Sequence, residues 1–264
     1  MASSTGTSSS SSRGYTDAAR QLLLIATLSR DKIISNNAKS FLKELAVQKD
    51  PKIKMLLEKF VSETKDNNAF LSSMHALVKE VSQRFYDDMY FDTSTEIGKS
   101  LSKGEREVKK LNENKNLIYG EISFSSFFDI LRKLNLSSFR EDLSSSGSSS
   151  NNSNSSSSSG KFKFYDLGSG TGKAVFAARI TQDFTSCIGI EVLESLNNQA
   201  TKIKNRFDSQ YRSLLFDPSN QRTIFHCGSF LEYDWSDGDV IFMNSTCFDE
   251  ELMSTYMCTY IYII

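Results

Sequence analysis

The chain has 264 residues, of which 31 are Lys or Arg and 32 are Asp or Glu, so its formal net charge is −1. That balance lacks the basic field of a protein that grips nucleic acid through its whole surface, and we expect no strong nucleic-acid patch. The chain has only 2 His, which excludes a histidine-rich metal site, and we expect no bound metal. Its longest apolar runs, 22–25 and 256–264, are far shorter than the ~20 residues of a membrane-spanning helix.

The four cysteines are Cys187, Cys227, Cys247 and Cys258, and none of them forms a C-x-x-C pair. Zinc sites and disulfide frameworks normally show such spacings, so we predict neither. Three of the four fall at expected strand positions, where a reduced Cys behaves as a small apolar residue. We therefore expect buried free thiols and a reducing compartment.

Two Ser-rich tracts interrupt the chain, at residues 1–15 and in a loop at 144–160. Their composition cannot bury enough apolar surface to fold, so both are expected to be disordered. Residues 16–116 are expected to form a helical region. Residues 117–255 are expected to form an α/β core around the second tract, followed by an atypical apolar tail at 256–264. Apolar residues spaced three and four apart mark one long helix: Phe70, Met74, Leu77, Val78, Val81, Phe85 and Met89.

After residue 160, short apolar runs alternate with helical stretches. Strands are expected at 161–167, 187–190, 222–226 and 239–243, with a helix opening near Lys173 and another ending near Phe207. Alternation of buried strands with helices is typical of βαβ units. The region is therefore predicted to be an α/β fold with a parallel sheet.

The first expected strand runs into a glycine-rich turn, DLGSGTGK at 166–173. Glycines permit backbone angles that other residues resist, and they let a ligand lie directly against the main chain. A nucleoside-triphosphate loop of the Walker A type is excluded, because Leu167 and Ala174 stand where it needs Gly and Ser or Thr. The match to a dinucleotide-binding fingerprint is weak, because Lys173 stands where that pattern has its third glycine. The pattern instead suits S-adenosylmethionine, which has no pyrophosphate to place on the helix.

Polar and aromatic residues follow the other expected strands. Glu191 ends the second, where its carboxylate can accept hydrogen bonds from ribose hydroxyls. Ser229 and Phe230 follow the third and would lie beside an adenine. Asn244 follows the fourth, at the carboxyl edge where doubly wound sheets bind their ligands.

Four stretches carry a family resemblance by their order: 119–121 (YGE) with Phe124 and Phe128, 166–172 (DLGSGTG), 228–231 (GSFL), and 240–244 (VIFMN) through Phe248. Over 117–253 the chain resembles the non-SET histone H3 lysine methyltransferases of the disruptor-of-telomeric-silencing family. The resemblance implies a Rossmann-like class I methyltransferase that uses S-adenosylmethionine and modifies lysine seventy-nine of histone H3. It also implies histone or nucleosome as partner and a nuclear location; without it we would expect a cytoplasmic one.

The same resemblance implies roles for individual residues. Tyr119 and Asn244 would stand at the methyl-transfer centre, and Tyr119 would belong to a loop that closes over the cofactor and lines the lysine channel. The cofactor-binding residues that the resemblance implies are Tyr119, Gly120, Glu121, Asp166, Gly168, Ser169, Gly170, Gly172, Glu191, Ser229, Phe230 and Asn244.

The later strands of that fold are not visible in the sequence, so we expect a sheet truncated after the fourth strand. The leading hypothesis is an S-adenosylmethionine-dependent protein-lysine methyltransferase. One alternative is a methyltransferase that acts on a non-histone protein or a small molecule. Another is a truncated, noncatalytic protein that binds cofactor or serves in interactions.

Overall fold

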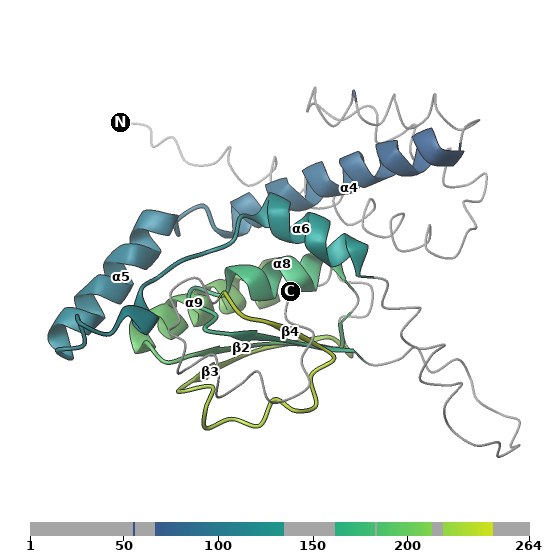
Figure 1. Cartoon of the computed structure of the whole chain (residues 1–264). Helices are drawn as coiled ribbons and strands as arrows, with labels where there is room; N and C mark the ends of the chain where they lie inside the picture. The colour runs from purple at the N-terminus through teal and green to yellow at the C-terminus, as the bar shows by residue number, and fades with distance from the viewer. Residues whose placement is uncertain (1–54, 56–66, 135–161, 183, 213–218, 245–264) are drawn as a thin grey trace, which may run out of the picture. The chain divides into compact units, whose positions relative to one another are not determined.

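The computed structural model describes residues 55, 67–134, 162–182, 184–212 and 219–244 (Figure 1). The tracts 1–15 and 144–160, the tail 256–264, Cys247 and Cys258 lie outside the described residues. The chain divides into two compact units, one of Met1–Asp92 with Ile203–Asn220 and one of Thr93–Lys202 with Gln221–Ile264. The domain boundaries expected from the sequence remain predictions.

The first unit contains helix α4 (Asn67–Met89) and the second half of helix α9 (Glu194–Gln210). The rings of Phe85 and Tyr211 meet edge to face, with centroids 4.7 Å apart. Arg206 forms an ion pair with Asp92, with Nη2 and Oδ2 2.6 Å apart. The predicted long helix is thus confirmed, and its buried apolar side chains include Leu77, Val78, Phe85 and Met89.

The second unit is built on a four-stranded sheet of order β3-β2-β1-β4. The strands are β1 (Lys163–Leu167), β2 (Ser186–Glu191), β3 (Arg222–Cys227) and β4 (Val240–Phe242). All neighbours are parallel, with Phe164 of β1 opposite Cys187 on one side and Val240 on the other. The α/β class and the Rossmann-like parallel sheet are therefore confirmed.

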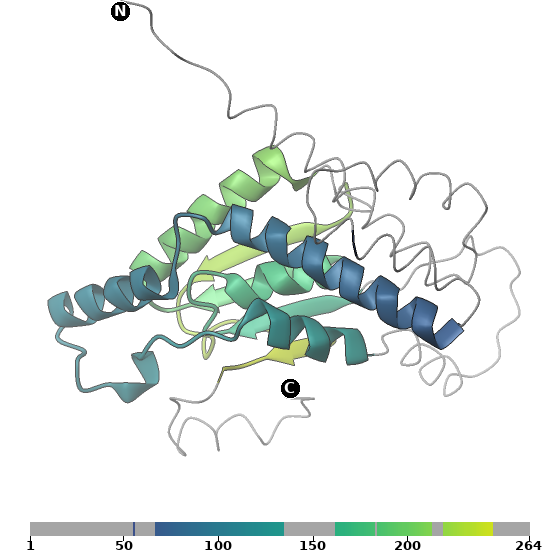
Figure 2. The ribbon, with the colours of Figure 1, turned by 90° about the horizontal axis from the view of Figure 1, so that it is seen from above.

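The helices of this unit are α5 (Thr95–Val108), the 3-10 turn η2 (Lys115–Leu117), α6 (Phe124–Lys133), α8 (Lys173–Thr181) and the start of α9. In two views, α6, α8 and the start of α9 lie on one face of the sheet (Figures 1 and 2). No helix of the described residues combines the length and the apolar character needed to cross a bilayer.

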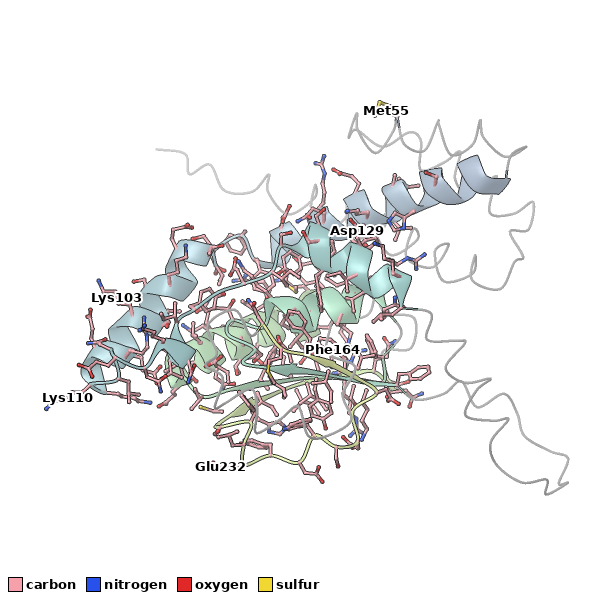
Figure 3. All side chains as sticks on the ribbon, in the orientation of Figure 1. Met55, Lys103, Lys110, Asp129, Phe164 and Glu232 are labelled. Atoms are coloured by element: carbon pink, nitrogen blue, oxygen red, sulfur yellow. The ribbon has the colours of Figure 1, made fainter. Side chains whose placement is uncertain are left out.

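Aromatic side chains fill the helix-covered face of the sheet. Phe164, labelled in Figure 3, is fully buried there, with ring centroids 6.1 Å from Phe127 and 5.5 Å from Phe184. Successive strand residues point to opposite faces, so Tyr165 and Leu167 belong to a second cluster on the other face. The segment between β3 and β4 covers that cluster with Phe230, Tyr233 and Trp235.

The two described cysteines are both free thiols, but they differ in burial. Cys187, in the central strand β2, is buried, and burial raises its pKa to about 11. The expectation of burial is wrong for Cys227, which is exposed because it ends β3, a strand at the edge of the described sheet. Across the described ranges, no three His, Cys, Asp or Glu side chains come together as a metal site requires.

Glu105 of α5 caps the start of α9. Its Oε1 accepts a hydrogen bond from the amide of Glu194 at 3.0 Å, and its Oε2 accepts one from the amide of Ser195 at 2.7 Å. Lys109 lies 2.6 Å from Oε1. Burial would raise the pKa of Glu105, but the hydrogen bonds from Lys109, Ser195 and Glu194 outweigh it and lower the pKa to about 2. A carboxylate at a helix N-terminus satisfies amides that have no partner within the helix.

Replacing Glu105 with Gln is expected to lower the free energy of unfolding at pH 7 by about 1–2 kcal/mol, because the cap loses its charge and one acceptor. Glu107→Gln is the control, since Glu107 is half exposed and 3.8 Å from Lys103, itself an exposed residue (Figure 3). A depressed carboxyl pKa stabilises the fold above the unfolded value of 4.5 and loses that effect as the pH falls toward 2.

Urea unfolding between pH 7 and pH 2.5 tests this expectation. The stability difference between the unmutated chain and Glu105→Gln should shrink as the pH falls through that window. A difference that does not change with pH, or an equal loss in Glu107→Gln, would show that Glu105 does not cap α9.

Candidate functional site

A pocket of about 330 Å³ lies at the carboxyl edge of the sheet. Residues that follow each of the four strands reach it, because the carboxyl ends of parallel strands meet at one edge of a sheet. Its volume falls within the range of sites that hold small molecules. The strand-end residues that line it are Gly168, Gly170, Glu191, Ser229, Phe230 and Asn244, and a second wall comes from 116–120.

The turn between β1 and α8 needs its glycines. Gly168, Gly170 and Gly172 have φ angles of 87°, 54° and 81°, which residues other than glycine rarely adopt. The amides of Gly168 and Ser169 both donate to the carbonyl oxygen of Ile190, at 2.9 and 3.0 Å, which fixes the turn to β2. A Cβ at Gly172 would lie 2.6 Å from the Phe225 ring, so this glycine serves packing and does not line the pocket.

Glu191 is the acid at the floor of the pocket, and it is only 6% exposed. Its Oε2 accepts from the amide of Gly170 and its Oε1 from that of Leu193, both at 2.8 Å. Burial raises the pKa of Glu191, and these backbone hydrogen bonds oppose the rise. A carboxylate offers about four acceptor positions. Glu191 therefore holds the glycine turn and can still accept hydrogen bonds from a ligand.

Asp166 faces a second, smaller hollow of about 20 Å³, which it lines with Glu121, Ser169 and Lys173. The small hollow and the larger pocket share Tyr119, Gly120, Gly168 and Asn244. Burial and the nearby Glu191 raise the pKa of Asp166 well above its usual value. The buried hydroxyl of Ser169 has no hydrogen-bond partner among the described residues. The small hollow is thus lined by two carboxyl groups, of which Glu121 is paired with Lys173.

The ring of Tyr119 is held between two glycines. A Cβ at Gly98 of α5 would lie 2.4 Å from its Cε1, and one at Gly170 would lie 2.6 Å from its Cε2. Its hydroxyl donates to Glu121 Oε2 at 2.6 Å and lies 2.9 Å from the hydroxyl oxygen of Thr171. Burial, followed by the hydrogen bond to Glu121, raises the pKa of Tyr119. The phenol therefore stays protonated near neutral pH.

Replacing Gly98 with Ala is expected to force the Tyr119 ring out of its place. The helical gain of Ala over Gly is about 1 kcal/mol, but overpacking costs about 1–3 kcal/mol, so stability should stay level or fall. Gly104→Ala in the same helix is the control, because no atom lies within 4 Å of its added Cβ. That variant should gain up to about 1 kcal/mol. Urea unfolding measures both, and equal gains would show that Gly98 is not packed against Tyr119.

The structure brings together eleven of the twelve residues that were expected at the site, and the twelfth, Gly172, lines neither cavity. The larger pocket takes Tyr119, Gly120, Gly168, Gly170, Glu191, Ser229, Phe230 and Asn244, and the small hollow adds Glu121, Asp166 and Ser169. Sequence reasoning missed Gly98, which stands in a helical stretch without any local sign of a close contact. It also missed Leu193 and Leu196, which line the pocket beyond β2.

Comparison with known proteins agrees with this arrangement of strands and turn. Residues 155–259 match the family model described as histone methylation protein DOT1. We call residues 155–259 the DOT1 segment. The DOT1 segment holds the four described strands, the glycine turn, Glu191, Phe230 and Asn244, whereas α5 and the 119–121 segment precede it. No curated protein matches the chain.

Proposed function

We propose that the chain is an S-adenosylmethionine-dependent protein-lysine methyltransferase that acts on histone H3 in the nucleus. The observation that carries the proposal is the position of Glu191. This buried acid faces a pocket of about 330 Å³ at the carboxyl edge of the DOT1 segment, directly beside the glycine turn. When bound, S-adenosylmethionine would supply a methyl group already activated by its sulfonium.

The residues at the edge of the sheet fit the nucleoside part of this cofactor. Glu191 keeps acceptor positions for the ribose hydroxyls. Phe230, Leu231 and Leu196 line the pocket and offer apolar surfaces to the adenine. An aromatic face of this kind stacks well on a heterocycle. The pocket therefore combines one polar anchor with apolar walls, as small-molecule sites commonly do.

The amino-acid end of the cofactor is proposed to lie against the residues that line the small hollow. Asp166 and Glu121 line it, so carboxyl groups are present for the ammonium group of the cofactor. Asp166 is held toward its protonated form by burial and by Glu191. A bound ammonium group would favour its ionised form, because an opposite charge nearby lowers the pKa of a carboxyl. Binding of the ammonium group and ionisation of Asp166 are therefore expected to favour each other.

Tyr119 and Asn244 line both cavities and are proposed to face the methyl-transfer centre. The substrate lysine must be neutral to attack, although its ordinary pKa is about 10.4. Tyr119 stays protonated and cannot take the proton, so we assign it to positioning. An apolar channel lowers the amine pKa by disfavouring its charged form. Orientation and exclusion of water would then supply most of the acceleration.

Transfer of a labelled methyl group tests this proposal. The chain is incubated with labelled S-adenosylmethionine and, in parallel, with nucleosomes, free histones, or nuclear extract split into protein and small-molecule fractions. Label on a lysine of histone H3, with lysine seventy-nine as the specific expectation, supports the proposal. Label only on other proteins or small molecules would support a different methyltransferase. A folded chain that binds cofactor but labels nothing would indicate a noncatalytic protein.

A further inference from the structure

The 119–121 segment has no helix or strand of its own, and side chains from two helices and from the segment itself meet on one of its residues. Glu121 Oε1 accepts from Lys173 Nζ at 2.6 Å and also from the hydroxyl of Thr95, and Oε2 accepts from the Tyr119 hydroxyl. Thr95 begins α5, and Lys173 begins α8 directly after the glycine turn. Glu121 is therefore the point where both helices attach to the segment.

The ion pair is well shielded from solvent. The side chains of Lys173 and Glu121 are 13% and 16% exposed, and their charged atoms are 2.6 Å apart. Exposed pairs contribute little, because water and salt screen them. Removing one partner of a shielded pair instead leaves the other charge without compensation. Burial would raise the pKa of Glu121, but hydrogen bonds from Lys173, Thr95 and Tyr119 lower it overall, so its carboxylate stays charged.

The segment that this pair holds separates the two cavities. Tyr119 and Gly120 line both the larger pocket and the small hollow, while Glu121 and Lys173 line the hollow alone. We infer that Lys173 is a positioning residue, which through Glu121 holds the 119–121 segment in place against the pocket. The segment is then ordered before any ligand binds, which lowers the entropic cost of binding. This inference builds on the proposed function only in naming S-adenosylmethionine as the ligand.

Hydrogen exchange of the ligand-free protein tests the inference without any activity assay. Lys173→Met should raise the exchange rates of the amides of Leu117 and Ile118, which directly precede the segment and donate to the carbonyl oxygens of Asn114 and Lys115. The expected rise is about 10- to 100-fold, between the effects of breaking an exposed and a buried pair. Lys173→Arg keeps the charge and should stay close to the unmutated chain. Lys204→Met is a matched control, because Lys204 pairs with Asp208 at the same 2.6 Å but lines neither cavity.

A double-mutant cycle shows whether Lys173 acts through Glu121. In a Glu121→Gln background, Lys173→Met should add little further exchange, because the pair is already broken. Equal effects in both backgrounds, or no effect of Lys173→Met on exchange, would overturn the inference. Circular dichroism confirms that each variant is folded before exchange is measured.

Titration with S-adenosylmethionine separates the two proposals. If the unmutated chain binds, Lys173→Met should weaken its affinity by about tenfold or more, because the segment must then be ordered on binding. Unchanged affinity in that variant would overturn the inference and leave the proposed function standing. Faster exchange in Lys173→Met, in a chain that binds no cofactor, would uphold the positioning role and contradict the proposed function.

Discussion

Replacing Glu191 with Ala is expected to weaken the binding of S-adenosylmethionine by at least about 100-fold. Hydrogen bonds to a charged group contribute about 1.5–3 kcal/mol each, and the ribose would lose two of them. The same change leaves the buried amides of Gly170 and Leu193 without their acceptor. The variant should therefore also lose about 2–4 kcal/mol of stability.

Glu191→Gln separates the loss of binding from the loss of the fold. Gln keeps the shape of the side chain and one acceptor oxygen, so this variant should remain closer to the unmutated chain in stability. Its amide nitrogen would nevertheless face a backbone N–H, and the ligand would lose a charged acceptor. Glu194→Gln is the control, since Glu194 is exposed and does not line the pocket. Calorimetry measures the affinity of each variant for S-adenosylmethionine, and urea unfolding measures its stability. Equal affinities in the two Gln variants would show that Glu191 does not contact the ligand.

Replacing Arg179 with Met is expected to lower the free energy of unfolding by about 2–6 kcal/mol, since each of two buried acceptors left without a donor costs about 1–3 kcal/mol. Arg179 of α8 is only 2% exposed. Its guanidinium donates to the carbonyl oxygens of Phe184 and Arg222 and lies 3.3 Å from the hydroxyl of Thr223. It thereby ties the end of α8 to the starts of the strands. Met would fill much of the space but would leave the two carbonyls without this donor.

Arg212→Met is the control for Arg179, since the Arg212 side chain is 38% exposed and lies 3.5 Å from Asp208. Such a pair contributes about 0–1 kcal/mol, so this variant should unfold at nearly the same urea concentration as the unmutated chain. A loss below about 1 kcal/mol in Arg179→Met, typical of surface substitutions, would show that the guanidinium is not needed to hold the sheet.

The sheet could be predicted from the sequence because three of its strands, β1, β2 and β4, are buried on both faces. Buried parallel strands are nearly continuous apolar runs, and the expected strand at 187–190 became β2 at Ser186–Glu191. The glycine turn and the acid at the end of β2 could be predicted to lie together, since the carboxyl ends of parallel strands share one edge of a sheet. These local signals located Glu191 and Asn244 at the pocket.

Long-range packing left no comparable signal. The contact between Gly98, Tyr119 and Gly170 joins positions far apart in the chain, and nothing near Gly98 distinguishes it from an ordinary helical glycine. Arg179 is fully buried although Arg is mostly an exposed residue. Cys227 is exposed because β3 is the edge strand of the described sheet. The order of strands in a sheet cannot be predicted from the local spacing of apolar residues.

Calorimetric titration of the folded chain with S-adenosylmethionine tests the central claim most directly. We predict saturable one-to-one binding that Glu194→Gln retains and Glu191→Ala loses. A folded chain that gives no heat of binding and no thermal stabilisation with S-adenosylmethionine would contradict the account.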